Sequence, residues 1–132
     1  MPGMLRNFLL VLLVIAQITA CSQCNILKGR YRSAGGSEQN TTLELSANDK
    51  FLLVYENWEP GNYENRKISK INGIWSCKDN QLILDMDSEK ITAVQITVGQ
   101  NPLGLNEDTK ALHFKGVSVD NFLNNEILYA TK

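Results

Sequence analysis

The chain has 132 residues, with 13 lysines and arginines, 14 aspartates and glutamates and a formal net charge of −1. That length suits one domain with its own hydrophobic core. The balanced charge, without a basic stripe or a polybasic run, argues against a nucleic-acid-binding protein and against purely electrostatic membrane attachment.

The N-terminal segment has the pattern of a cleaved secretory signal. Arg6 provides a small positive region, and residues 8–16 form an unbroken apolar run that ends near small residues at 19–20. The run is too short for a bilayer span, which needs about 20 apolar residues. We therefore expect residues 1–20 to be removed on export, which leaves a mature chain of 112 residues with a net charge of −2.

The junction of this segment resembles the bacterial lipoprotein signal. Ile18, Thr19, Ala20 and Cys21 match its order of an aliphatic residue, two small residues and a cysteine that is acylated after cleavage. The resemblance implies covalent lipid, including palmitate, at Cys21, and several acyl chains give a stable membrane anchor. An uncharged Ser22 implies, by the same resemblance, the outer membrane with the protein facing the periplasm. The alternative is an ordinary secreted protein.

The three cysteines fit this interpretation. An odd number in an exported protein needs an explanation. If lipid consumes Cys21, then Cys24 and Cys77 remain, and an oxidising periplasm permits them to pair. We predict a disulfide between these two, worth roughly 4 kcal/mol in the chain-entropy model. The alternative is two free thiols, with Cys77 acting as a small buried apolar side chain.

After the signal the chain has a β-strand pattern throughout. Leu43 and Leu45 alternate with polar neighbours, as in a half-buried strand. Turn-forming pairs such as Asn48-Asp49 and Pro60-Gly61 separate the strands. Short strands about ten residues apart indicate an all-β fold, a small antiparallel meander barrel. The expected strands are 29–33, 41–46, 51–55, 67–71, 74–77, 81–86, 91–98, 112–117 and 126–129.

Two irregularities interrupt this rhythm. Ile68 and Ile71 are three residues apart, and this break in alternation predicts a bend or bulge near Asn72-Gly73. Residues 121–126 are the only expected helical turn, since no segment keeps a 3.6-residue period. The predicted organisation is a signal peptide at 1–20, a lipidated tether at 21–27 and a single β-barrel domain at 28–132.

Parts of the mature chain resemble small lipocalin-like barrel lipoproteins, including the amino-terminal domain of the NlpE-type lipoproteins of copper resistance and envelope stress. The matching stretches are Gly29-Arg30-Tyr31, Thr41-Thr42-Leu43-Glu44-Leu45, Asn48-Asp49-Lys50-Phe51, Gly73-Ile74-Trp75 and Leu82-Ile83-Leu84. The resemblance implies the barrel fold and the envelope location. That family carries a Cys-x-x-Cys after its first strand, whereas loop 33–40 has neither cysteine nor histidine. No copper or redox role is therefore implied.

No side-chain pattern indicates an enzyme, a metal site or a cofactor. His113 alternates with apolar neighbours and has no recognisable acidic partner. Asp85, Asp87 and Glu89 could line one face as a cation site, but the favoured interpretation of these residues is a solvated turn. We expect no catalytic residue, no metal and no cofactor.

Two aromatic residues are the expected partner-binding side chains. Trp58 and Tyr63 flank the Pro60-Gly61 turn, where packing does not require large rings. Aromatic residues on loops are enriched at interfaces. The alternative is that Trp58 folds back as a lid over one end of the barrel.

These observations lead to a functional expectation. We expect a non-catalytic cell-envelope lipoprotein that binds or senses an unknown envelope protein or small ligand. One alternative is a carrier of a small apolar ligand in a barrel cavity. Another is a periplasmic inhibitor or immunity protein against a lytic enzyme, which a projecting charged loop at 63–66 would favour.

Overall fold

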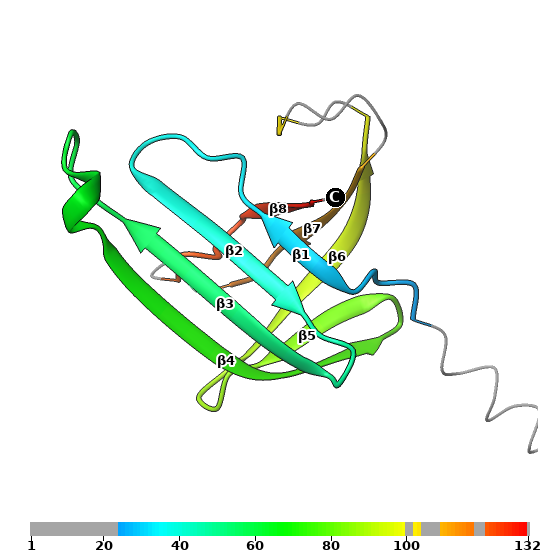
Figure 1. The fold of residues 1–132 in the computed structure, drawn as a ribbon. Coiled ribbons are helices and arrows are strands. Elements are labelled where there is room, and N and C mark those ends of the chain that lie inside the picture. The colour runs from blue at the N-terminus through cyan, green and yellow to red at the C-terminus, as the bar shows by residue number, and fades with distance from the viewer. Residues whose placement is uncertain (1–23, 100–101, 104–108, 118–120, 132) are drawn as a thin grey trace, which may run out of the picture.

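The computed structural model contains eight strands in one closed antiparallel barrel (Figure 1). Each strand pairs with the next along the chain, and β8 pairs with β1 to close the sheet. The predicted all-β meander barrel is confirmed. The strands are β1 (Gly29–Arg32), β2 (Gln39–Leu45), β3 (Lys50–Asn57), β4 (Lys67–Lys78), β5 (Gln81–Asp85), β6 (Lys90–Val98), β7 (Thr109–Phe114) and β8 (Ile127–Ala130).

The structure describes residues 24–99, 102–103, 109–117 and 121–131. The expected signal segment at 1–20 and the expected lipid attachment at Cys21 lie outside the described residues. Within the described ranges, no helix has the length and apolarity needed to cross a bilayer.

The one helix of the described chain is the 3-10 helix η1 (Tyr63–Asn65). Residues 121–126, expected to form a helical turn, form hydrogen-bonded turns and no helix. Hydrogen bonds of the i to i+3 type join Asn124 N–H to the Asn121 carbonyl and Glu126 N–H to the Leu123 carbonyl. Asn125 then adopts a φ of 57°, and this left-handed backbone ends any helical winding before β8 begins.

Hairpin turns follow the turn chemistry of the sequence. Asp49, Asp79, Asn80 and Asp87 all have a positive φ, between 53° and 64°. Asn and Asp enter the left-handed region more readily than other non-glycine residues. Two consecutive positive φ values at Asp79-Asn80 are typical of the two-residue turn whose twist matches the flanking strands. Local turn residues therefore set the strand rhythm.

Side chains fill the interior of the barrel. Trp75 is buried, and its Nε1–H donates to the Ser46 carbonyl at 3.0 Å. Ser46 is the first residue after β2, so this bond joins β4 to the turn between β2 and β3. The largest fully buried side chains are Tyr31, Phe51, Phe114, Leu43, Leu45, Leu53, Leu82, Leu84, Leu112, Leu123 and Leu128.

β4 runs through Asn72-Gly73 without a bulge. Its register with β3 is continuous, and the strand curves as it passes from β3 to β5 (Figure 1). The predicted bulge is therefore wrong, while the predicted bend is present. Ile68 is exposed and Ile71 packs against the core. The odd spacing of these two residues places them on opposite faces of one regular strand.

The first four described residues, expected in the tether, lie against one end of the barrel. Cys24 forms a disulfide with Cys77 on β4, with Cα atoms 5.8 Å apart, inside the range that a disulfide requires. The predicted pairing is confirmed. Ile26 is buried and joins the core. The Gln95 side chain on β6 bonds the backbone on both sides of Ile26, at 3.2 and 2.9 Å.

Candidate functional site

The topology sorts the connections between strands to the two ends of the barrel, because successive turns of a meander alternate between ends. Figure 1 shows the β3–β4 loop (green) and the start of the described chain (blue) on opposite sides. Two contacts link loops at the end that holds the β3–β4 loop. Trp58 N–H donates to the Glu38 carbonyl, and Asn121 Nδ2 donates to Glu89 Oε1, both at 3.0 Å. We name these ends the loop end (33–38, 58–66, 86–89 and 121–126) and the disulfide end (24–28, 46–49 and 79–80).

The aromatic cluster, Trp58, Tyr63 and Arg66, projects from the loop end. The two rings meet edge to face, with centroids 4.9 Å apart. The Arg66 guanidinium lies 4.5 Å from the centre of the Tyr63 ring, a cation–π contact. Its Nε is 3.8 Å from Glu56 Oε2, close enough for charge attraction but too far for a hydrogen bond. Tyr63 is 51% exposed, and neither ring belongs to the buried core.

A hydrogen-bonded turn holds this cluster. Asn62 N–H donates to the Glu59 carbonyl at 2.9 Å, and Gly61 has a φ of 75°. Proline followed by a glycine with positive φ is the pattern of a type II turn, as the Pro60-Gly61 pair predicted. The 3-10 helix η1 follows at once, and Asn65 Nδ2 bonds Asn62 Oδ1 at 2.9 Å. The two rings therefore stand on an ordered loop.

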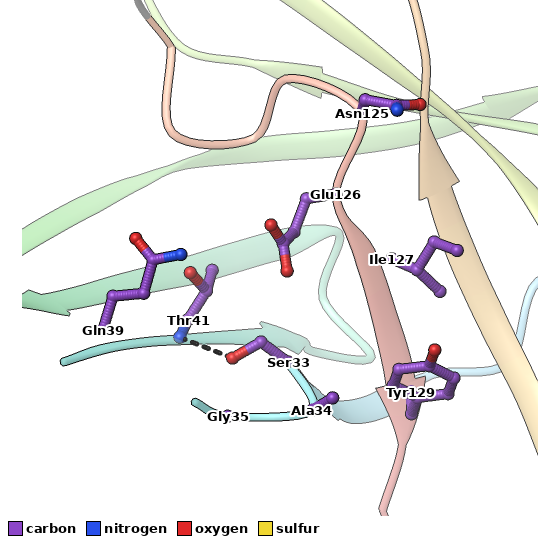
Figure 2. A pocket seen from close by; sticks show the side chains of 9 residues that line it. All are labelled: Ser33, Ala34, Gly35, Gln39, Thr41, Asn125, Glu126, Ile127 and Tyr129. Carbon is purple, nitrogen blue, oxygen red and sulfur yellow. Dashed lines mark hydrogen bonds between the residues drawn. The ribbon is translucent and has the colours of Figure 1, made fainter. Parts of the chain in front are cut away.

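A polar pocket of about 230 Å³, the seam pocket, opens at the same end beside the junction of β1 and β8 (Figure 2). The two strands pair at Tyr31↔Ala130 and Arg32↔Tyr129, and the pocket lies beyond these pairs. Sequence analysis did not identify it. Its lining residues are Ser33, Ala34, Gly35, Gln39, Thr41, Asn125, Glu126, Ile127 and Tyr129.

Two buried polar side chains form one wall of the seam pocket. Ser33 is 7% exposed and Thr41 is 4% exposed. Ser33 Oγ accepts the Thr41 backbone N–H at 3.0 Å and donates to Asn40 Oδ1 at 3.2 Å. The Thr41 hydroxyl has no hydrogen-bond partner among the described residues. It is therefore available to a group that enters the pocket.

Glu126 provides the carboxylate of the seam pocket. Its backbone is fixed on both sides, because its N–H donates to the Leu123 carbonyl and its carbonyl accepts the Phe114 N–H, both at 3.0 Å. Figure 2 shows the carboxylate turned toward Thr41 and Ser33. Burial raises the pKa of this carboxyl, since desolvation disfavours the charged form. Within the described chain, no cation lies at ion-pair distance from it.

The other candidates from the sequence do not assemble into a site. His113 is partly exposed, and its Nε2 lies 2.9 Å from Asn125 Oδ1. Asp85 pairs with Lys90 across the hairpin, and Glu89 accepts a hydrogen bond from Asn121. In the described parts of the chain, no three metal-ligating side chains come together.

Comparisons with protein-family models, curated proteins and solved structures find no match for this chain. The closed eight-stranded antiparallel barrel is compatible with a lipocalin-like architecture.

Proposed function

We propose that this protein is a non-catalytic bacterial envelope lipoprotein, akin to the NlpE-type lipoproteins, that binds another envelope protein through its loop end. The main observation that supports this proposal is that the aromatic cluster lies at the end of the barrel opposite the disulfide end. Cys21 is three residues before Cys24, so the intervening chain spans about 10 Å at most. Lipid on Cys21 would hold the disulfide end at the outer membrane and direct the loop end into the periplasm.

The composition of the aromatic cluster supports a protein partner. Tryptophan, tyrosine and arginine are the residue types most enriched among side chains that dominate interface energy, and the cluster contains one of each. The ordered turn beneath them lowers the entropy that binding must spend on immobilising the loop. A cluster with an exposed Tyr63 ring and partly buried Trp58 and Arg66, held on a hydrogen-bonded turn, favours recognition of a protein surface.

The filled interior favours this proposal over the carrier of a small apolar ligand. Fully buried leucine, phenylalanine and tyrosine side chains make up the core, where such a ligand would have to lie. The second candidate function is inhibition of, or immunity to, a lytic enzyme. The observation that favours it is the projecting loop itself, which carries Glu64 and Arg66 beside the exposed Tyr63 ring.

Lipid attachment is testable at one residue. The Cys21→Ser variant should lose metabolic labelling with palmitate and remain unprocessed, because the acyl acceptor is gone. Gel mobility and labelling of cell envelopes measure both effects. The Cys24→Ser variant is the matched control and should keep the label while it loses the disulfide. Unchanged processing and membrane partitioning of Cys21→Ser would refute lipidation.

The aromatic cluster is tested by replacing Trp58 and Tyr63 together with alanine. The free energy of unfolding should fall by less than about 1 kcal/mol, as is usual for exposed loop positions, and urea unfolding measures it. A photo-crosslinking amino acid at Tyr63 should capture a specific envelope protein, and Trp58→Ala should abolish that product. The same crosslinker at Asp79, on the disulfide end, is the control and should not capture it.

A role of Trp58 as a lid over the barrel end predicts a different stability of the double variant. If Trp58 serves as a lid over the barrel end, the double variant should lose about 3–5 kcal/mol, as a buried tryptophan does. That loss, together with a crosslinking pattern unchanged by Trp58→Ala, would remove the aromatic cluster from any role in binding.

A further inference from the structure

The seam pocket holds an unusual combination of groups. Glu126 brings a partly buried carboxylate that has no cationic neighbour among the described residues. Thr41 brings a hydroxyl from a residue that is 96% buried, and this hydroxyl has no partner within the described chain. Both groups face the pocket and are accessible to a ligand that enters it, since the buried side-chain atom without a hydrogen-bond partner in the described chain is Arg66 Nε, outside the pocket.

The chemistry of the lining narrows the occupant. Two acceptors of the lining have no partner among the described residues, the Glu126 carboxylate and the Thr41 oxygen, whereas the amide oxygen of Gln39 already accepts the Tyr55 hydroxyl at 3.3 Å. An anion would meet the Glu126 charge, and an apolar group would leave that carboxylate buried and unpaired. A group with several N–H donors and no acceptor is complementary, as in a lysine ammonium or an arginine guanidinium.

The size of the pocket limits how much can enter. Its volume of about 230 Å³ lies below the range of about 300–1,000 Å³ that is usual for pockets of drug-sized ligands. One aliphatic chain with a cationic head fits this space. Backbone hydrogen bonds on both sides of Glu126 hold its main chain at the pocket wall before binding.

We propose that the seam pocket binds an organic monocation, an ammonium or guanidinium group, with Glu126 as its counter-ion and the Thr41 hydroxyl as a second acceptor. A lysine or arginine side chain of a partner protein would be the natural source, and that part of the inference rests on the proposed function. The pocket and the aromatic cluster are contiguous, because Trp58 N–H bonds Glu38 next to Gln39. One partner surface can therefore cover both.

The test uses the purified full-length mature protein in an uncharged detergent, with N-acetyl-lysine amide as the probe. Its addition should move the backbone amide NMR signals of Ser33, Thr41, Glu126 and Tyr129. N-acetyl-norleucine amide, which has the chain without the ammonium, should leave them unmoved. Glu126→Gln should weaken binding of the lysine probe about tenfold or more, because the ion pair loses its charge.

Two further variants test whether a loss of probe binding is specific to the seam pocket. Glu44→Gln removes the same charge on β2, but Glu44 pairs with Arg30 at 3.5 Å outside the pocket, so probe binding should be unchanged. Thr41→Val keeps the side-chain shape but removes the hydroxyl, so it should weaken binding of the lysine probe. This variant still tests the pocket if Glu126→Gln disturbs the fold. Equal shifts with the norleucine probe, or binding that neither Glu126→Gln nor Thr41→Val weakens, would overturn the proposal.

The source of the cation is settled by the crosslinker at Tyr63. If Glu126→Gln weakens both the lysine probe and the crosslinked product, the cation belongs to the partner protein. If it weakens the probe and leaves the product intact, the pocket binds a free small amine. Failure of the probe to bind while crosslinking persists would refute this inference and leave the proposed function standing.

Discussion

Replacement of both Cys24 and Cys77 by alanine should lower the free energy of unfolding by about 4 kcal/mol. The two residues are 53 positions apart, so the bond removes a large share of the conformations open to the unfolded chain. Urea unfolding measures the change. A reductant should destabilise the wild-type protein by a similar amount and leave the double variant unaffected.

A control separates the bond from the packing of the segment that it holds. Gln95→Ala removes the two hydrogen bonds to the backbone around Ile26 but keeps the disulfide. Intramolecular hydrogen bonds contribute about 0.5–1.5 kcal/mol each, so this variant should lose about 1–3 kcal/mol, less than the double cysteine variant. Equal losses, or a loss below about 1 kcal/mol without the disulfide, would contradict a role of the bond in restricting the unfolded chain.

The same disulfide matters for the proposed orientation at the membrane. With the bond intact, only three residues separate Cys21 from a point fixed on β4. Without it, the segment around Ile26 is held by side-chain packing and the hydrogen bonds of Gln95. The loop end would then lose its constant direction relative to the lipid anchor.

Gly73→Ala should also destabilise the barrel, by about 1–3 kcal/mol, the usual penalty for overpacking. Gly73 pairs with Phe51 across β3 and β4. A Cβ on Gly73 would overlap the backbone carbonyl oxygen of Asp85 and would lie 2.9 Å from the Phe51 ring. A carbonyl in a strand cannot move aside as a flexible side chain can, so β4 and β5 would have to separate locally.

The matched control is the residue before it. Asn72→Ala lies on the outward face of the same strand, where Asn72 is exposed, and surface changes of this kind stay within about 0.5 kcal/mol. Thermal unfolding of the two variants gives the comparison. Gly73→Ala with the same midpoint as Asn72→Ala would show that the β4–β5 backbone accommodates the methyl group.

Sequence reasoning reached the strands because their causes are local. Alternating burial along β2 follows from its alternating residue types, and residues that tolerate positive φ, such as Asp79 and Asn80, mark the turns. It failed where a local pattern had two structural meanings. The spacing of Ile68 and Ile71 fits a bulge or a regular two-faced strand, and only the partners on either face distinguish them.

The sequence by itself determined the all-β meander and its hairpin turns, because periodicity and turn chemistry are carried by neighbouring residues. The cysteine count left Cys24 and Cys77 either paired or free, and the structure decided for the disulfide. Tertiary structure alone decided the seam pocket, since barrel closure brings Glu126 beside Thr41, 85 positions earlier in the chain. It also decided that Ile26 packs into the core. Such contacts depend on which strands meet when the sheet closes, and no local pattern encodes that meeting.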